Sequence, residues 1–215
     1  LFSTVAGCGG GSSGGGDTSS QPPPVVDERP GGIWFGTVFN ASLGSSWEVI
    51  GITLDSGESR FIDELGSQYT ANINVTGTSF SGSLFAVAPA GSTFINGSPT
   101  ATGTISGTIS ERSELSGTYR MSTGETGTLS LFYDDTYERT SSLQMTRGTW
   151  IDINGDTYTV QADGTLFGQD SFGCVYNGRL TTIDPAFNAY RVRIDVANCS
   201  GFNGTYTGLG TLGDW

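Results

Sequence analysis

Carboxylates are the side chains through which this chain of 215 residues could do acid–base or metal chemistry. All nine basic residues are arginine, and the chain contains no lysine and no histidine. A serine–histidine or cysteine–histidine nucleophile, an imidazole zinc site and a lysine Schiff base are therefore excluded within this chain. Catalysis would have to use carboxylates, and oxygen-rich loops would suit calcium.

Two short acidic clusters are the candidates for such chemistry. Asp134, Asp135 and Glu138 form one, and Asp63 with Glu64 forms the other. Neither is framed by aromatic residues like the carboxylates of a glycosidase cleft. We expect both to be solvated acids of a protein with a net charge of −12, and we assign no catalytic residue, no metal ligand and no cofactor. This charge also argues against nucleic acid as a partner.

The segment from Asp152 to Asp156 is a weak candidate for a calcium loop. Its glycine is misplaced for such a loop, and no glutamate closes the site. A β-hairpin explains the same residues better, because Asn154-Gly155 suits a type I′ turn. In that register Ile151 would pair with Tyr158.

Cys174 and Cys199 flank a predicted hairpin and could meet across adjacent antiparallel strands. We expect a disulfide between them, because an exported chain meets oxidising conditions. The alternative is two buried free thiols. Cys199 has the opposite parity to Val192, Ile194 and Val196, so a bridge needs a bulge or the outer face of the sheet.

Aromatic residues at strand spacing in the first half could line an apolar ligand cavity. Besides Phe35, the candidates are Trp34, Trp47, Phe61, Tyr69, Phe80 and Phe85. The alternative is that these side chains simply fill a small barrel, because eight strands enclose an interior only just wide enough for side chains.

Period-two alternation of apolar residues predicts an all-β chain of antiparallel hairpins. We expect about eight strands in a first unit over residues 32–133, a join over residues 134–147 and a second unit over residues 148–215. Each unit would be a barrel or a sandwich with meander connections, because both architectures bury one face of every strand.

The two units share short motifs in the same order, which indicates a diverged duplication with an extra hairpin in the first unit. Gly32-Ile33-Trp34 corresponds to Gly148-Thr149-Trp150, and Ser56-Gly57 corresponds to Asp163-Gly164. We also match Ser116-Gly117-Thr118-Tyr119 with Asn203-Gly204-Thr205-Tyr206.

Gly-x-Trp at the start of an antiparallel meander resembles the lipocalin-like, or calycin, barrels. The resemblance implies that Trp34 closes one barrel end and that a late arginine, here Arg120, packs over it. No arginine follows Tyr206, so the second unit departs from this pattern. A carrier of an apolar small molecule is the function that the resemblance suggests.

Cys8 ends the segment Val5-Ala6-Gly7-Cys8 and precedes a run of glycine and serine. These residues resemble the lipobox of bacterial lipoproteins. The resemblance implies that residues 1–7 are a signal-peptide remnant, that Cys8 carries a diacylglycerol and that Gly9 directs the protein to the outer membrane. Residues 8–31 would then be the lipid-bearing cysteine and a flexible tether. The alternative is an ordinary thiol in a tail.

Together these features predict a lipid-anchored β protein of the bacterial outer membrane, on its periplasmic or surface face. We expect it to work by binding or by assembly and not as an enzyme. One alternative is the lipocalin-like carrier. Another is a subunit of a surface filament, which would join a protein partner or its own copies through strand edges.

Overall fold

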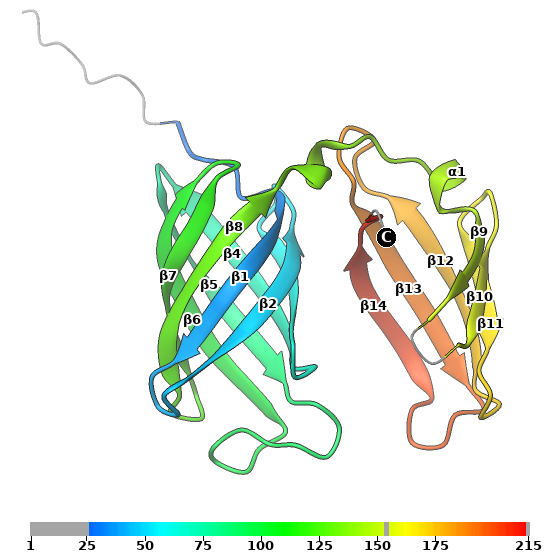
Figure 1. Cartoon of the computed structure of the whole chain (residues 1–215), viewed down its shortest axis with the longest axis horizontal. Helices are drawn as coiled ribbons and strands as arrows, with labels where there is room; N and C mark the ends of the chain where they lie inside the picture. Colours follow the sequence, from blue (N-terminus) through cyan, green and yellow to red (C-terminus); the bar gives the residue numbers. More distant parts are fainter. Residues whose placement is uncertain (1–25, 153–154, 214–215) are drawn as a thin grey trace, which may run out of the picture.

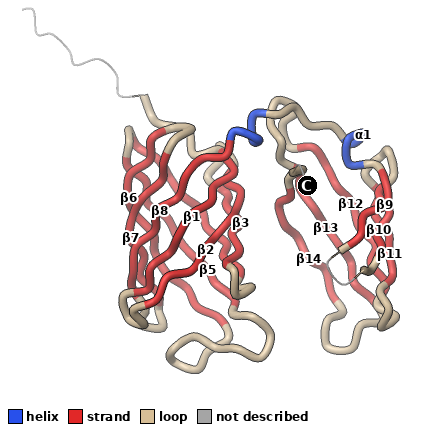
Figure 2. The backbone as a smooth tube through the Cα atoms, viewed as in Figure 1, coloured by secondary structure: helices blue, strands red, loops and turns tan. Residues whose placement is uncertain are grey.

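The computed structural model describes residues 26–152 and 155–213. Within these ranges the chain forms a closed eight-stranded antiparallel barrel followed by a six-stranded antiparallel sheet (Figures 1 and 2). The prediction of an all-β chain with two consecutive antiparallel units is therefore confirmed. No helix among the described residues has the length and apolar character needed to cross a membrane.

The barrel is an up-and-down meander in which each strand pairs with the next, and the last pairs with the first. Closure leaves no unpaired edge, so the first unit is a barrel and not a sandwich. Its strands are β1 (Gly32–Asn40), β2 (Ser45–Thr53), β3 (Glu58–Asp63), β4 (Gln68–Thr76), β5 (Ser79–Val87), β6 (Thr100–Ser110), β7 (Glu114–Met121) and β8 (Thr126–Asp134).

The barrel core is built from alternate residues of the strands, as period-two patterning requires. On β4, for example, Ala71 and Ile73 are buried, whereas Asn72 between them is exposed. The buried cluster consists of Trp34, Val49, Ala71, Ile73, Phe80, Ile109, Leu115, Leu129 and Leu131.

The second unit is a single curved sheet in the order β14-β13-β12-β11-β10-β9. Within the described ranges β9 and β14 each pair on one side only, so this unit is neither of the two expected architectures, closed barrel or sandwich. Its strands are β9 (Gly148–Ile151), β10 (Thr157–Val160), β11 (Thr165–Gln169), β12 (Val175–Thr182), β13 (Tyr190–Ala197) and β14 (Gly204–Gly210).

The six strands of the sheet repeat β1 to β6 of the barrel in order and in register. Trp34 pairs with Gly51 as Trp150 pairs with Tyr158. The pair Thr53 and Ser59 recurs as Val160 and Leu166, and Tyr69 and Ala86 recur as Tyr176 and Val196. The pair Leu84 and Gly103 recurs as Ile194 and Tyr206.

A tight glycine turn recurs in both units, 107 residues apart, at positions 57 and 164. Gly57 and Gly164 both have a φ of 85°. The carbonyl of Gly57 accepts from the Ile73 N–H at 3.0 Å, and that of Gly164 accepts from the Leu180 N–H at 2.8 Å. A Cβ at Gly57 would collide with the Ile73 carbonyl oxygen, so the turn requires glycine.

The third motif match between the units is wrong. Ser116–Tyr119 lies on β7, whereas Asn203–Tyr206 enters β14, which takes the place of β6. Similar polar-Gly-Thr-Tyr sequences fit neighbouring strands of any meander, so the motif does not identify the strand. The extra hairpin of the first unit is β7–β8.

The hairpin between β9 and β10 also differs from its predicted register. Ile151 pairs with Thr157, and Trp150 pairs with Tyr158. The Asp152 N–H donates to the Asp156 carbonyl at 3.0 Å, so the pairing is shifted by one residue from the prediction. The predicted turn residue Asn154, with Ile153, lies outside the described residues.

The Cys174–Cys199 disulfide is present, with the Cα atoms 4.5 Å apart. Cys174 directly precedes β12, and Cys199 lies two residues after β13 ends. Between β13 and Cys199, Asn198 has a left-handed φ of 57°. This local turn provides the irregularity that the parity of Cys199 requires.

The two units pack together through the join and the β12–β13 loop. The join contains a 3-10 turn, η1 (Asp135–Glu138), and a short helix, α1 (Leu143–Thr146). Tyr137 of η1 stacks on Phe187, with ring centroids 4.9 Å apart, and packs with Ile33, Leu54 and Ala189. At the edge of this contact Arg191 donates two hydrogen bonds to Glu58.

Candidate functional site

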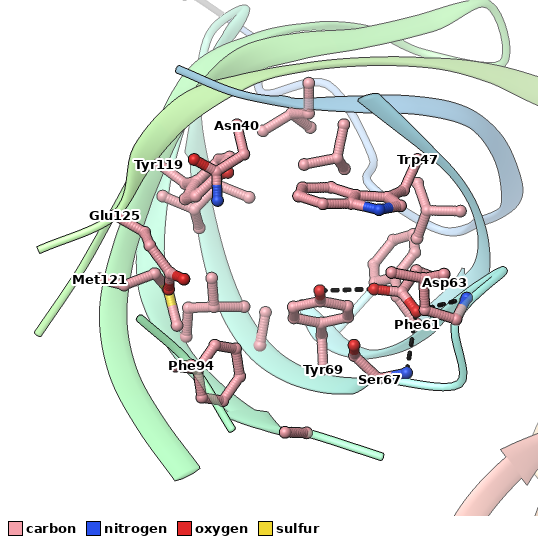
Figure 3. Close-up of a pocket in the computed structure, with 18 of the residues that line it drawn as sticks. Asn40, Trp47, Phe61, Asp63, Ser67, Tyr69, Phe94, Tyr119, Met121 and Glu125 are labelled. Atoms are coloured by element: carbon pink, nitrogen blue, oxygen red, sulfur yellow. Dashed lines mark hydrogen bonds between the residues drawn. The ribbon is translucent and has the colours of Figure 1, made fainter. Parts of the chain in front are cut away.

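The interior of the barrel contains a cavity of about 580 Å³. Its wall is mostly apolar, with Trp47 and Phe61 on one side and Tyr119 and Met121 on the other (Figure 3). The volume is within the range of pockets that hold small organic ligands, which is about 300–1,000 Å³. The barrel is therefore not filled by its own side chains.

One end of the barrel is closed by Trp34 and by the segment that precedes β1. Trp34 is fully buried, its Nε1 donates to the Pro30 carbonyl at 3.1 Å, and Tyr133 meets it edge to face. Residues 27–29 bind the turns at this end: Asp27 accepts from the Gly77 N–H, and Arg29 forms an ion pair with Glu111.

The calycin-like role predicted for Trp34 is therefore observed, but the role predicted for Arg120 is wrong. Arg120 is exposed near the end of β7, where it pairs with Thr126. Trp34 pairs with Tyr133, at the opposite end of β8. The barrel thus places Arg120 toward the end opposite Trp34.

The opposite end is the mouth of the cavity. The lining there includes Leu43 from the β1–β2 turn, Leu65 from the β3–β4 turn and Ile95 from the long β5–β6 loop. These side chains are 52%, 57% and 49% exposed, respectively. An apolar rim of this kind favours entry of apolar molecules.

Asp63 stands at the rim with both carboxylate oxygens engaged by the protein. One oxygen accepts from the Leu65 and Ser67 N–H groups at 3.0 and 2.8 Å, and the other accepts from the Tyr69 hydroxyl at 2.8 Å. Burial, and then the hydrogen bond to Asp63, raise the pKa of Tyr69 above its ordinary value. Tyr69 is therefore a protonated donor at neutral pH, and Asp63 fixes the turn.

Glu125 plays a similar part on the other side of the mouth. Its carboxylate accepts from the Ile95 N–H at 3.3 Å and from the Thr123 hydroxyl at 2.9 Å, which ties the β5–β6 loop to the β7–β8 turn. Burial and the charge of Glu125 raise the pKa of Tyr119 to about 12.

Several polar groups of the lining remain available to a ligand, among them the side-chain amide N–H of Asn40, whose oxygen alone has hydrogen-bond partners among the described residues (Figure 3). Among residues 26–152 and 155–213, no protein partner hydrogen-bonds to the Tyr119 hydroxyl or the Trp47 indole N–H. The buried hydroxyls deeper in the wall, by contrast, satisfy each other: Thr53 donates to Ser59 at 3.0 Å, and Ser59 donates to the Gly57 carbonyl at 3.1 Å.

Four of the six predicted lining residues do line the cavity: Trp47, Phe61, Tyr69 and Phe80. Trp34 instead plugs the closed end. Phe85 is 43% exposed and is not part of the lining, because Leu84 is the residue of that strand that points inward. Phe35 is likewise exposed, on the outer surface beside Phe132.

Sequence reasoning missed the polar and loop residues of the mouth. Glu125 and the loop residues Phe94 and Ile95 lie outside the strands, and Asn40 is a polar residue at the end of β1, so only the closed barrel brings them to one end. Asp63 was predicted only as a solvated acid. A signal was available in the recurrence of Asp63 and Tyr69 as Asp170 and Tyr176, six residues apart in both cases.

The other candidate clusters have structural roles or lie outside the description. Asp134 caps η1 by accepting from the Thr136 N–H, and Glu138 pairs with Arg112 at 3.2 Å. Asp170 lies close to Cys174 and Cys199, but the disulfide uses both sulfur atoms. Cys8 lies outside the described residues.

No protein-family model, no curated protein and no solved structure matches this chain. The chemistry of the cavity is therefore the basis for a functional proposal.

Proposed function

We propose that the barrel binds a small, mostly apolar molecule in its cavity and that the protein works by binding rather than by catalysis. The observation that supports this most directly is the apolar cavity of about 580 Å³ with an apolar rim. A barrel fold of this kind is compatible with a binding or carrier module. Asp63 and Glu125 each accept two or more hydrogen bonds from the protein, which argues against an acid–base role.

The free polar groups indicate what the ligand carries. Tyr119, Trp47 and Asn40 each offer a hydrogen-bond donor inside a mostly apolar wall. A ligand with one acceptor oxygen on a hydrocarbon or aromatic body would satisfy one of them while filling the remaining volume. A highly charged ligand would meet few partners here.

The test is a fluorescence titration with N-phenyl-1-naphthylamine, an apolar probe that brightens away from water. We expect the protein to bind it and Leu84→Trp to weaken binding roughly tenfold or more, because the larger ring enters the cavity. Phe85→Trp is the matched control, since it changes the neighbouring outward position. Equal binding by both variants, or none by the parent protein, would contradict the proposal.

We propose further that the protein is held at the bacterial outer membrane by a lipid on Cys8. The support is the lipobox-like segment ending at Cys8 and the Gly/Ser run that follows it. The intact mass of the protein extracted from its native membrane tests this, and a diacylglycerol on Cys8 is expected. A Cys8→Ser variant should carry no lipid and should no longer associate with the membrane. An unmodified Cys8 in membrane-derived protein would refute it.

A further inference from the structure

The sheet β9–β14 repeats the first six strands of the barrel, but among the described residues nothing joins its two edges. In the barrel the corresponding gap is filled by the hairpin β7–β8, which pairs with β6 on one side and with β1 on the other. Figure 1 shows β9 and β14 as separate edges of the curved sheet. The gap between β9 and β14 is called the seam below.

The side chains at the seam are large and aromatic, of a kind usually buried inside a protein. Trp34 and Trp150 are equivalent, and each donates its Nε1 to the carbonyl four residues earlier. Trp34 is 0% exposed because Tyr133 of β8 packs against it, whereas Trp150, with no such strand beside it, is 41% exposed. On the other edge Tyr206 is 49% exposed.

The concave face of the sheet continues this apolar surface. Ile194, Val196, Phe202 and Tyr206 border an open hollow of about 750 Å³ next to the disulfide. The equivalents of Ile194 and Val196 in the barrel, Leu84 and Ala86, face inward. An open apolar face between two unpaired strand edges is a site for strand addition.

We propose that the seam receives one antiparallel β-hairpin with the residue pattern of β7–β8, which completes an eight-stranded barrel. Its first strand pairs with β14 and its second with β9. Its inward positions are apolar at every second residue, as Leu115 and Tyr119 are on β7 and Leu129, Leu131 and Tyr133 are on β8. An aromatic residue in the place of Tyr133 covers Trp150.

The register of the barrel gives a sharp test by cross-linking. Phe35 pairs with Phe132, and Ile151 is the equivalent of Phe35. The full chain with Cys8→Ser and Ile151→Cys is mixed with a synthetic peptide of residues 113–135 that carries Phe132→Cys. Ile151 is 71% exposed, so its replacement leaves the fold intact. Directly opposed residues are close enough for a disulfide.

The matched control peptide carries its cysteine at Ser130, which is on the same face two residues out of register. We expect the first peptide to form the disulfide at least tenfold faster than the control. Equal rates, or no reaction with either, would overturn the proposal.

Hydrogen exchange of the unmodified full chain tests the same idea without a cysteine. We expect the amides of β9 and β14 that point into the seam, away from β10 and β13, to exchange freely in the protein alone and about tenfold or more slowly when the peptide of residues 113–135 is present. A peptide of scrambled sequence should change nothing. The same segment appended after Trp215 through a glycine–serine linker raises its effective concentration and should give the protection without added peptide.

A second copy of the chain is the competing occupant. If the edges are already protected in the protein alone and it sediments as a dimer, the copies fill the seam and the hairpin proposal is wrong. If the edges stay open and neither the peptide nor the fusion protects them, the proposal is wrong as well. None of these results bears on ligand binding in the first barrel.

Discussion

At the scale of single residues, the pair Asp63 and Tyr69 shows how a carboxylate can fix local structure. Asp63 accepts from two backbone N–H groups and from the Tyr69 hydroxyl, and it fixes a turn at the mouth of the cavity. Asp170 makes the same contacts with Phe172, Cys174 and Tyr176 in the sheet. The recurrence indicates that this hydrogen-bonded turn is part of the structural repeat that the barrel and the sheet share.

Replacing Tyr69 by phenylalanine should lower the free energy of unfolding by about 1–3 kcal/mol, because a buried carboxylate oxygen loses its donor. Tyr176→Phe removes the same hydrogen bond beside a less buried aspartate, and it should cost less. Urea unfolding of both variants gives the comparison. A larger loss for Tyr176→Phe would mean that burial does not determine the strength of this contact.

The aromatic lining could be predicted in part because strand periodicity assigns a face to each residue. Trp47 and Tyr69 have polar neighbours that identify the inward side. Leu84, Phe85, Ala86 and Val87 are all apolar, so alternation could not decide which of them faces inward. The choice of Phe85 was wrong for that reason.

At the scale of elements, the disulfide joins two loops at the hollow of the sheet. Cys174 is the equivalent of Ser67 in the barrel, where the same turn holds without a bridge. The disulfide therefore stabilises the chain entropically more than it shapes the turn. Asp170 continues to fix the turn through its own hydrogen bonds.

Changing both cysteines to serine should destabilise the sheet by about 3 kcal/mol, since the bridge closes a loop with a sequence separation of 25 residues. The barrel should be unaffected, because neither residue contributes to its core. In denaturant unfolding, Trp fluorescence reports both units, through Trp34, Trp47 and Trp150, whereas probe binding reports the barrel alone. Loss of probe binding together with the sheet would show that the two units unfold as one.

Strand positions and the two-unit order could be predicted from alternation and glycine turns, but closure could not. Period two is the same in a barrel, a sandwich and an open sheet, because it reports only which side of a strand is buried. Whether β8 returns to β1 depends on contacts about 100 residues apart, which no local pattern records. The unpaired edges of the second unit could not be predicted from the sequence for the same reason.

At the scale of the whole molecule, the described residues of the barrel and the sheet meet in an apolar cluster with an ion pair beside it. Tyr137, Phe187 and their neighbours form the cluster, and the Arg191–Glu58 ion pair lies at its edge. The hydrogen bond from Arg191 holds the pKa of Glu58 below its ordinary value of 4.5. The pair therefore supports docking above about that pH, and its support is lost as the pH falls through the lowered pKa.

Arg191→Ala should loosen the contact between the two units at neutral pH, and the parent protein should loosen in the same way as the pH falls through the lowered pKa of Glu58. A larger radius of gyration in small-angle scattering would report this. Arg193→Ala is the control, because Arg193 pairs with Asp195 within its own strand. An unchanged radius for Arg191→Ala would show that the apolar contact alone sets the arrangement.

The chain enters the barrel through the end that Trp34 plugs, and the mouth lies at the far end. Figure 1 shows the loops that border both hollows, β5–β6 and β13–β14, on the side opposite the blue segment that precedes β1. Any attachment on the N-terminal side would therefore hold the molecule by its closed end. The barrel cavity and the hollow of the sheet would then both open away from the point of attachment, toward the solvent.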